Sequence, residues 1–273
     1  MKLILARLKI ILKLCLNLYF SPKIIYSKLK YRNPRNPQIN RIVKELRKDG
    51  IAYLKNFYSR EQINQIYQEL VPEVDKLDHS RDNCIQDGVF WLDSDKSKMV
   101  QKNYGYSRLL DISKYGKSSK SHAQNKFFRE VASAYYGREC NSSQSIIQKS
   151  VAPDNPVGLD YHLDGILPRF KTFLYLHDVS KEHGPFSLVK GTQRMSWFRA
   201  RKVINMAIGD ATKESIIQPD EMNLHVKGKF KEEIAVANAG TLIFADVNSI
   251  HRGILTHKGF ERYAVAVYFS PKD

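Results

Sequence analysis

The stretch GTLIFADVNSIHRGILTHKGFERYAVAVYFS, residues 240–270, decides the fold of this chain. It holds two strongly apolar runs, 241–247 and 263–269, separated by a polar stretch that contains two glycines. The second run alternates after Arg262, as strands do, because successive side chains of a strand point to opposite faces. The segment therefore predicts a strand and then a loop, with His251 after them and a second strong strand that begins near Arg262.

Runs of the same texture recur from about residue 143 onward, namely SQSIIQKSV at 143–151, KTFLYLHDV at 171–179 and PFSLVKG at 185–191. Gly, Pro and Asn residues lie between these runs. Short strands at this spacing favour an antiparallel sandwich or barrel over a parallel sheet with crossover helices. Residues 193–230 interrupt the strands, and we expect a partly helical insertion there.

The N-terminal half is expected to be mainly helical. Residues 40–50 have helical spacing with a terminal glycine as a stop, and IAYLKNF at 51–57 reads as a short strand. Ser59 and Gln62 form a capping-box pattern for a helix that Pro72 is expected to end.

Residues 80–120 are polar and irregular, and 121–137 read as one more helix that ends in glycine. The whole of 37–273 is therefore expected to be one domain, mainly β with flanking helices (α+β).

Residues 1–36 are expected to be a basic amphipathic arm and linker, and the two Asn-Pro pairs within 31–40 indicate a linker or turn. Residues 1–20 offer no more than four consecutive apolar residues, so neither a transmembrane span of ~20 residues nor a secretory signal is expected. On a helix Lys2, Lys9, Lys13 and Asn17 fall within one narrow arc, and apart from Arg7 the wide remaining face is apolar. We expect residues 1–30 to lie on an anionic membrane surface or to pack on the catalytic body.

The formal net charge is +16, from 44 basic and 28 acidic residues. Residues 1–50 hold 13 of the basic and two of the acidic residues, which leaves 31 and 26 in the rest of the chain. A nearly neutral body without an Arg-rich recognition helix argues against nucleic acid binding. Cys15, Cys84 and Cys140 are odd in number and widely spaced, which fits a reducing compartment. We expect a cytoplasmic location, with or without peripheral attachment to the inner membrane surface.

YHLDGILPRF, residues 161–170, places a histidine and an aspartate one residue apart. Residues i and i+2 of a strand share a face, so His162 and Asp164 can reach one small ligand. An ordinary polar pair at a strand end is the alternative. If the β-rich half is a barrel, His251 can face this pair. Two imidazoles and one carboxylate then form the facial triad of non-haem Fe(II) oxygenases, with three positions open.

The six other histidines lack partners at ligand spacing and read as structural or solvated: His79, His122, His177, His183, His225 and His257.

The order of these segments resembles the phytanoyl-CoA dioxygenase family of Fe(II)- and 2-oxoglutarate-dependent oxygenases. The resemblance rests on HLD, then KTFLYLHDVSKEHGPFSLVKGTQ, then GTLIFADVNSIHRG, and an arginine eleven residues after His251. DGIAYLKNFYSREQI resembles the beginning of that family's domain, so the resemblance covers most of 48–270. Leu163 departs from it, since several family members have a polar residue there. The resemblance implies a double-stranded β-helix, a jelly-roll or cupin-like barrel.

By the same resemblance, His162, Asp164 and His251 would hold Fe(II), with 2-oxoglutarate and O2 as cosubstrates. Arg262 would bind the distal carboxylate of 2-oxoglutarate. The residue pattern agrees, because Arg262 heads an alternating strand and a guanidinium binds a carboxylate with two parallel hydrogen bonds. An exposed strand end is the alternative for this arginine.

Three further residues are candidates for the pocket. Lys171 alternates with apolar residues of its strand and is either a second anion contact or a solvated lysine. Tyr161 and Gln148 are candidates for substrate binding, with core packing as the alternative for both.

The expected activity is hydroxylation of an unactivated C–H bond in a small-molecule or lipid-like substrate, with release of succinate and CO2. A zinc hydrolase could use the same three ligands, although it gives no reason for Arg262. A membrane-tethered, non-catalytic barrel that acts as a binding module is the other alternative.

Overall fold

The computed structural model describes residues 34–77, 89–91, 98–101, 105–153, 160–165 and 169–272. The predicted arm of residues 1–30 and parts of the predicted irregular region 80–120 lie outside these ranges. Within the described residues, no helix is both long enough and apolar enough to cross a bilayer.

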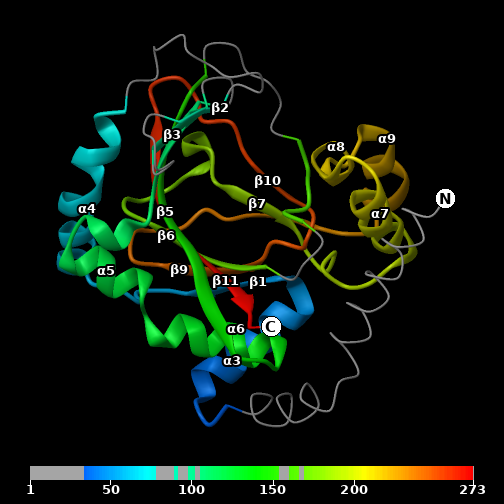
Figure 1. Cartoon of the computed structure of the whole chain (residues 1–273), viewed down its shortest axis with the longest axis horizontal. Helices are drawn as coiled ribbons and strands as arrows, with labels where there is room; N and C mark the ends of the chain where they lie inside the picture. The colour runs from blue at the N-terminus through cyan, green and yellow to red at the C-terminus, as the bar shows by residue number, and fades with distance from the viewer. Residues whose placement is uncertain are drawn as a thin grey trace.

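Two antiparallel sheets form the body of the molecule (Figure 1). In the part of the chain that the structure describes, the larger sheet has eight strands, in the order β1 (Ile51–Leu54), β9 (Leu242–Asp246), β6 (Phe170–Tyr175), β11 (Glu261–Pro271), β5 (Cys140–Val151), β4 (Tyr106–Leu110), β3 (Lys98–Gln101) and β2 (Val89–Trp91). The smaller sheet contains β10 (His251–Gly253), β7 (Phe186–Val189) and β8 (Glu232–Ile234). This mainly β architecture with flanking helices confirms the predicted double-stranded β-helix.

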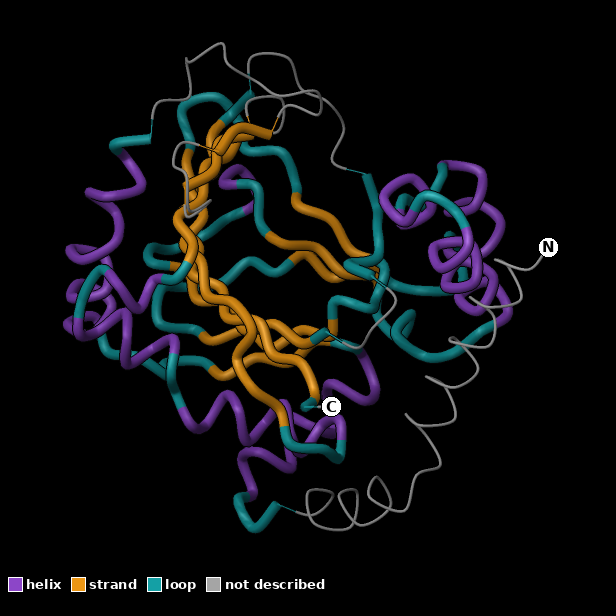
Figure 2. The backbone as a smooth tube through the Cα atoms, in the orientation of Figure 1, coloured by secondary structure: helices purple, strands orange, loops and turns teal. Residues whose placement is uncertain are grey.

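Four helices cover the outer face of the larger sheet: α3 (Pro37–Asp49), α4 (Arg60–Asp75), α5 (Lys117–Ala123) and α6 (Lys126–Tyr136) (Figure 2). Alternate residues of β11 pack against them, among them Val265 and Val267, which are completely buried. Since side chains of a strand alternate, the residues between them must face the opposite side, toward the smaller sheet.

Several helix ends follow the predicted local signals. Gly50 ends α3 in the left-handed conformation at φ 81°, and Gly137 ends α6 in the same way. At the start of α4, Ser59 and Gln62 cap each other reciprocally, as the capping box requires.

Other local predictions were wrong. The second Asn-Pro pair does not belong to a linker: Asn36 caps α3 and Pro37 is its first residue. Pro72 lies inside α4 instead of ending it. The neighbouring Val71 and Val74 are buried in the core, and Pro72 itself is exposed, so packing outweighs the lost backbone hydrogen bond.

The region 80–120 also contains more regular structure than predicted, since β2, β3, β4 and most of α5 fall within it. The single helix predicted over 121–137 is divided into α5 and α6, because Asn125 adopts an extended conformation and caps α6 with its side chain.

A mainly helical segment follows β7. It contains α7 (Trp197–Ile208), α8 (Ala211–Ser215), α9 (Pro219–Glu221) and the helical turn η4 (Met222–Val226). Its Met206 and Val226 share a buried cluster with Leu163 and Ile250. The segment is thereby packed against the two stretches that carry His162 and His251.

Candidate active site

Backbone pairing brings the two distant histidines together. His162 and His251 exchange both N–H···O bonds, at 2.9 and 3.1 Å, as an isolated antiparallel bridge. The Asp164 amide continues this pairing with a 3.3 Å hydrogen bond to the carbonyl of Val247. Because Asp164 is two residues after His162, its side chain emerges on the same face.

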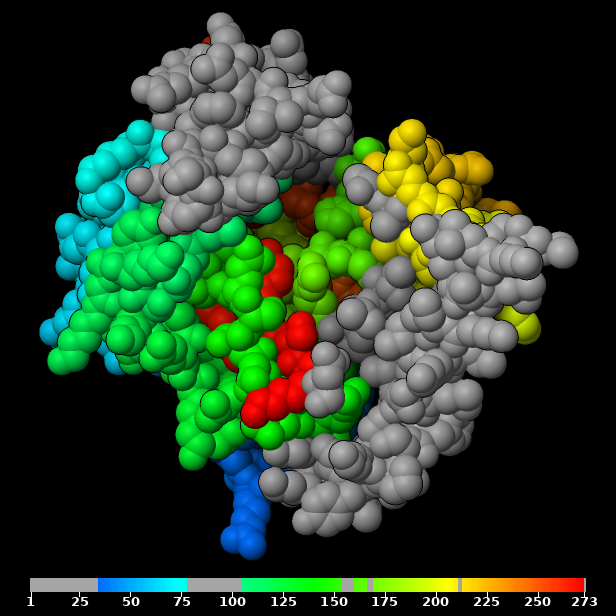
Figure 3. Space-filling view, in the orientation of Figure 1, coloured from blue at the N-terminus to red at the C-terminus, as the bar shows by residue number. Residues whose placement is uncertain are grey.

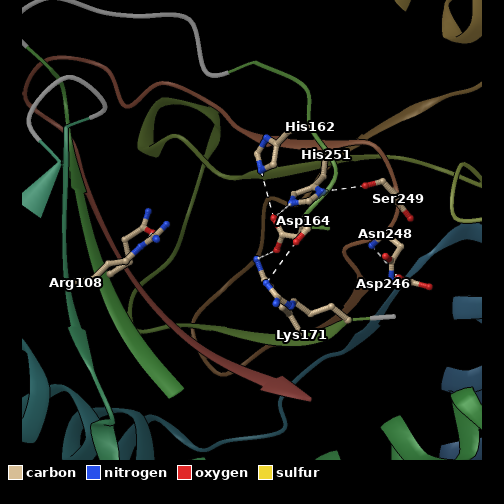
Figure 4. Close-up of polar contacts among 10 residues, drawn as sticks. Arg108, His162, Asp164, Lys171, Asp246, Asn248, Ser249 and His251 are labelled. Carbon is tan, nitrogen blue, oxygen red and sulfur yellow. Dashed lines mark hydrogen bonds and ion pairs between the residues drawn. The ribbon is translucent and has the colours of Figure 1, made fainter. Parts of the chain in front are cut away.

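The side chains of His162, Asp164 and His251 form one cluster (Figure 4). One candidate ligand atom from each residue lies within 4.8 Å of the others. Asp164 Oδ1 is 3.5 Å from His162 Nε2 and 3.2 Å from His251 Nε2. The structure therefore brings together all three residues that the sequence predicts as metal ligands.

Each imidazole is held in the tautomer that a metal ligand needs. His162 Nδ1 lies 2.9 Å from the carbonyl oxygen of Asp160, and His251 Nδ1 lies 2.9 Å from that of Ser249. A carbonyl oxygen can only accept, so Nδ1 carries the proton in both rings. In its neutral form each ring with this hydrogen bond presents the Nε2 lone pair to the cluster, which is the usual arrangement around a bound metal.

The charge state of the cluster also suits a cation. Burial lowers the pKa of His251 from its ordinary value and favours the neutral ring, although the Asp164 carboxylate acts in the opposite direction. Burial alone would raise the pKa of Asp164, but Lys171 and His251 outweigh it and hold that pKa well below its usual range. Burial thus favours a neutral His251 ring beside an ionised Asp164 carboxylate.

Lys171 is buried, not solvated. Its Nζ lies 2.5 Å from Asp164 Oδ2, and its side chain is 10% exposed. The ammonium also lies 4.5 Å from the ring centroid of Tyr268. Its observed partner in this structure is the Asp164 carboxylate.

A tight turn between β9 and β10 positions His251. Asp246 is buried and accepts hydrogen bonds from the Tyr135 hydroxyl at 2.7 Å and from the Asn248 backbone at 2.9 Å. The turn closes with Ser249 N donating to Asp246 O, and Ser249 O in turn receives the His251 ring proton. Tyr135 is on α6, so these hydrogen bonds connect an outer helix to the ring of His251.

The helical segment after β7 supports the cluster from the other side. Lys202 of α7 is buried and donates to the carbonyl of Ile216 at 2.8 Å, and Ile216 forms a β-bridge with His162. Arg199 of the same helix donates to the carbonyl of Asn248 in the turn. Both histidine-bearing stretches are therefore fastened to α7.

Arg262 is the second residue of β11 and is only 7% exposed. It donates to the carbonyl of Gly184 and, from Nη2, to Ser150 Oγ at 3.1 Å, while its Nε has no partner. No carboxylate among the described residues lies within 4.0 Å of its guanidinium. A buried guanidinium without a counter-charge is suited to bind a ligand carboxylate.

One cavity of about 300 Å³ joins Arg262 to the histidine cluster. The strand register explains its lining: Arg262, Ala264, Ala266 and Tyr268 alternate along the inner face of β11. The space-filling view shows this face of the molecule hollowed between β5 and the helical segment (Figure 3).

The two residues predicted to bind substrate are placed differently. Gln148 of β5 lines the cavity, with its amide between Arg108 at 2.7 Å and Ser150 at 2.9 Å. Tyr161 does not line it: the neighbour of His162 faces the other side, where its ring lies 4.1 Å from the Arg252 guanidinium and borders a separate hollow.

Arg108 and Ser150 line the cavity, but the sequence did not suggest them. Arg108 lies on β4, inside the region predicted as irregular, so its inward orientation was not evident. The only signal was the alternation of YSRLL at 106–110, which matches the observed alternation of burial. Within the described residues, none of the other histidines joins a metal-binding group.

The fold resembles those of solved non-haem enzymes at low sequence identity. The non-heme alpha ketoglutarate dependent carbocyclase SnoK from nogalamycin biosynthesis aligns with a TM-score of 0.60 and 14% identity, over 85% of this chain and 84% of that chain. The epimerase SnoN of the same biosynthesis gives 0.58 and 11%, over 86% and 83%. HygX from Streptomyces hygroscopicus, crystallised with nickel, 2-oxoglutarate and hygromycin B, gives 0.52 and 12%, over 85% and 87%.

No family model and no curated protein matches this chain. The phytanoyl-CoA dioxygenase family therefore stays a prediction, and identities of 11–14% show a shared fold. The chain has the jelly-roll fold of these non-haem enzymes.

Proposed function

We propose that this chain is an Fe(II)- and 2-oxoglutarate-dependent oxygenase that hydroxylates an unactivated C–H bond of a small-molecule or lipid-like substrate. The observation that carries the proposal is one cavity that both histidines of the His162–Asp164–His251 cluster line together with the buried Arg262, which lacks a carboxylate partner among the described residues. A zinc hydrolase would need the three metal ligands, but it would not need Arg262.

In this proposal the three clustered residues hold Fe(II) from one side and leave the other positions open. Arg262 binds the distal carboxylate of 2-oxoglutarate and fixes its orientation. Bound iron would supply the oxidising chemistry, in which 2-oxoglutarate, O2 and the substrate give succinate, CO2 and an alcohol.

The chain itself orients the reactants and excludes water. Phe173 and Phe186 stack across the two sheets with ring centroids 4.7 Å apart, and Phe186 lies 5.5 Å from the His251 ring. These aromatic side chains make the cavity wall beside the cluster apolar. An apolar wall keeps the substrate carbon skeleton, and not water, next to the metal ligands.

The test is a calorimetric titration of 2-oxoglutarate into the protein, with Ni(II) in place of Fe(II) and without any metal. We expect tight binding only with metal, and loss of metal binding in His251→Ala, with exposed His257→Ala as the matched control. Metal-independent 2-oxoglutarate binding, or unchanged metal affinity in His251→Ala, would contradict the proposal.

Succinate formation with Fe(II) and O2 across a panel of lipids, acyl thioesters, amino acids and glycans would then find the substrate. The similarity to a carbocyclase and an epimerase makes the product worth identifying as well. A product heavier than the substrate by one oxygen atom supports hydroxylation, and one of equal or lower mass contradicts it.

We further propose, from the sequence alone, that residues 1–30 attach the protein to anionic membranes. Their seven Lys and Arg residues would each contribute about 1 kcal/mol near such a surface. Liposome co-sedimentation of the full chain and of a chain that begins at Asn33 tests this. Equal sedimentation of both chains on anionic lipid would rule the attachment out.

A further inference from the structure

Arg108 is a second arginine of the cavity, and no described residue provides its counter-charge. It lies on β4, directly across from Gln148 of β5, and its Nε donates to Gln148 Oε1 at 2.7 Å. Its guanidinium carbon is 4.3 Å from the centroid of the Tyr106 ring. No carboxylate of the described residues lies within 4.0 Å of Arg108. Both contacts are with neutral groups, so within the described part of the chain its positive charge is not compensated.

Each of the other cations of the cavity has an ion-pair partner or a proposed ligand. Lys171 is paired with Asp164 at 2.5 Å, and Arg252 is paired with Glu232 at 3.2 Å. Arg262 is assigned to 2-oxoglutarate by the proposed function. Among the described lining residues, Arg108 is therefore the cation that has neither an ion-pair partner nor an assigned ligand, and in a concave site an anion is bound more strongly than on an open surface.

A short hydrogen-bond chain fixes the two arginines relative to each other. Gln148 accepts from Arg108 and donates from Nε2 to Ser150 Oγ at 2.9 Å, and Ser150 Oγ also accepts from Arg262 Nη2 at 3.1 Å. With Nε of Arg108 held by Gln148, its two terminal nitrogens have no acceptor among the described residues. They can therefore make two parallel hydrogen bonds to an incoming oxyanion.

The position of Arg108 points to the substrate and not to the cosubstrate. Figure 4 shows it on the opposite side of the site from the His162–Asp164–His251 cluster and Lys171. Between these two sides the cavity is lined by apolar groups, among them Ile146 and Phe173. A ligand that spans the cavity would contact Arg108 at one end, and its carbon skeleton would lie along the apolar wall.

We propose that Arg108 binds a carboxylate or phosphate group of the primary substrate, while Arg262 holds 2-oxoglutarate. The substrate class is thus a small molecule with an anionic group at one end and an apolar part that presents a C–H bond to the cluster. This inference rests on the proposed function for the assignment of Arg262.

The test uses protein loaded with Ni(II) and saturating 2-oxoglutarate, titrated by calorimetry with three matched probes: phenyl phosphate, phenylacetate and uncharged phenylacetamide. The wild type should bind one or both anions at least 10-fold more tightly than the amide. Arg108→Gln should remove this preference, and Arg108→Lys should keep part of it, since it keeps the charge but not the planar fork. Arg129→Gln, which removes a charge from the exposed face of α6, should behave as the wild type.

The relative affinities of phosphate and carboxylate identify which anion the site prefers. The inference is overturned if the wild type does not distinguish anions from the amide, or if Arg108→Gln keeps the preference. It is also overturned if Arg108→Gln weakens 2-oxoglutarate binding as much as Arg262→Gln does, because Arg108 would then belong to the cosubstrate site. If the wild type fails to bind 2-oxoglutarate, the proposed function fails. The anion titration is therefore repeated on Arg262→Gln without 2-oxoglutarate, where Arg108 is tested alone.

Discussion

Replacing Arg262 by Gln should weaken the binding of 2-oxoglutarate roughly 100- to 4,000-fold. The side chain is 7% exposed, so solvent screens its charge little and the scale for a buried ion pair applies. Removing one partner of such a pair costs about 3–5 kcal/mol, and each 1.4 kcal/mol corresponds to a tenfold change in Kd. An exposed arginine would account for less than about 1 kcal/mol.

The assay is calorimetric titration of 2-oxoglutarate into Ni(II)-loaded protein, so that turnover does not disturb the binding equilibrium. Arg262→Lys keeps the charge and should recover only part of the affinity, because Lys lacks the planar pair of donors. Arg129→Gln controls for the loss of one charge. Thermal unfolding should show that the Arg262→Gln protein is folded, since the Gly184 carbonyl also loses its donor.

An Arg262→Gln protein that binds 2-oxoglutarate within threefold of the wild type would refute the assignment. The cosubstrate carboxylate would then have to be bound by another cation of the cavity, and Arg108 and Lys171 are the described candidates.

Three other perturbations test the environment of the site. Lys171→Met should lower the free energy of unfolding by about 3–5 kcal/mol in urea titrations with chelator present, and by less with metal, because it leaves the buried Asp164 carboxylate without its cation. Asp246→Ala should weaken metal binding about 10- to 100-fold, measured by competition with a chelating dye, since it removes the hydrogen bonds that shape the turn before His251. Burial lowers the pKa of His122 to about 3 from 6.5, so between these values the unfolded chain takes up a proton that the folded chain does not. The free energy of unfolding should therefore fall by about 1.4 kcal/mol for each unit that the pH drops, and urea titrations at pH 7 and pH 5 should show a smaller loss in His122→Phe.

The ligands could be predicted from sequence because their relation is mostly local. His162 and Asp164 share a strand face by spacing alone, and His251 follows a strand whose apolar run is unmistakable. The inward direction of Arg262 follows from the same alternation. Tyr161 shows the limit of this reasoning, since the alternation that places His162 in the cavity turns its neighbour away.

What the sequence did not reveal depends on long-range pairing and packing. Arg108 lies in a polar stretch that is a strand because β5 pairs with it, and no local pattern reports that pairing. The role of Asp246 requires a hydroxyl from Tyr135, more than a hundred positions away in the chain. Pro72 continues a helix because buried neighbours on the same helix hold it against the sheet.

Two alanines on β11 have a consequence for the evolution of this protein. Ala264 and Ala266 face the cavity from a strand that is paired with β5 on one side and β6 on the other, so its backbone cannot move away from a larger side chain. Any added methyl groups would extend into the cavity and shorten the molecules that fit there. Neither alanine side chain can form a hydrogen bond or carry a charge. Substitutions at these two positions alone can therefore change the size of substrate that homologous proteins accept. The histidines, the aspartate and the arginines can remain unchanged.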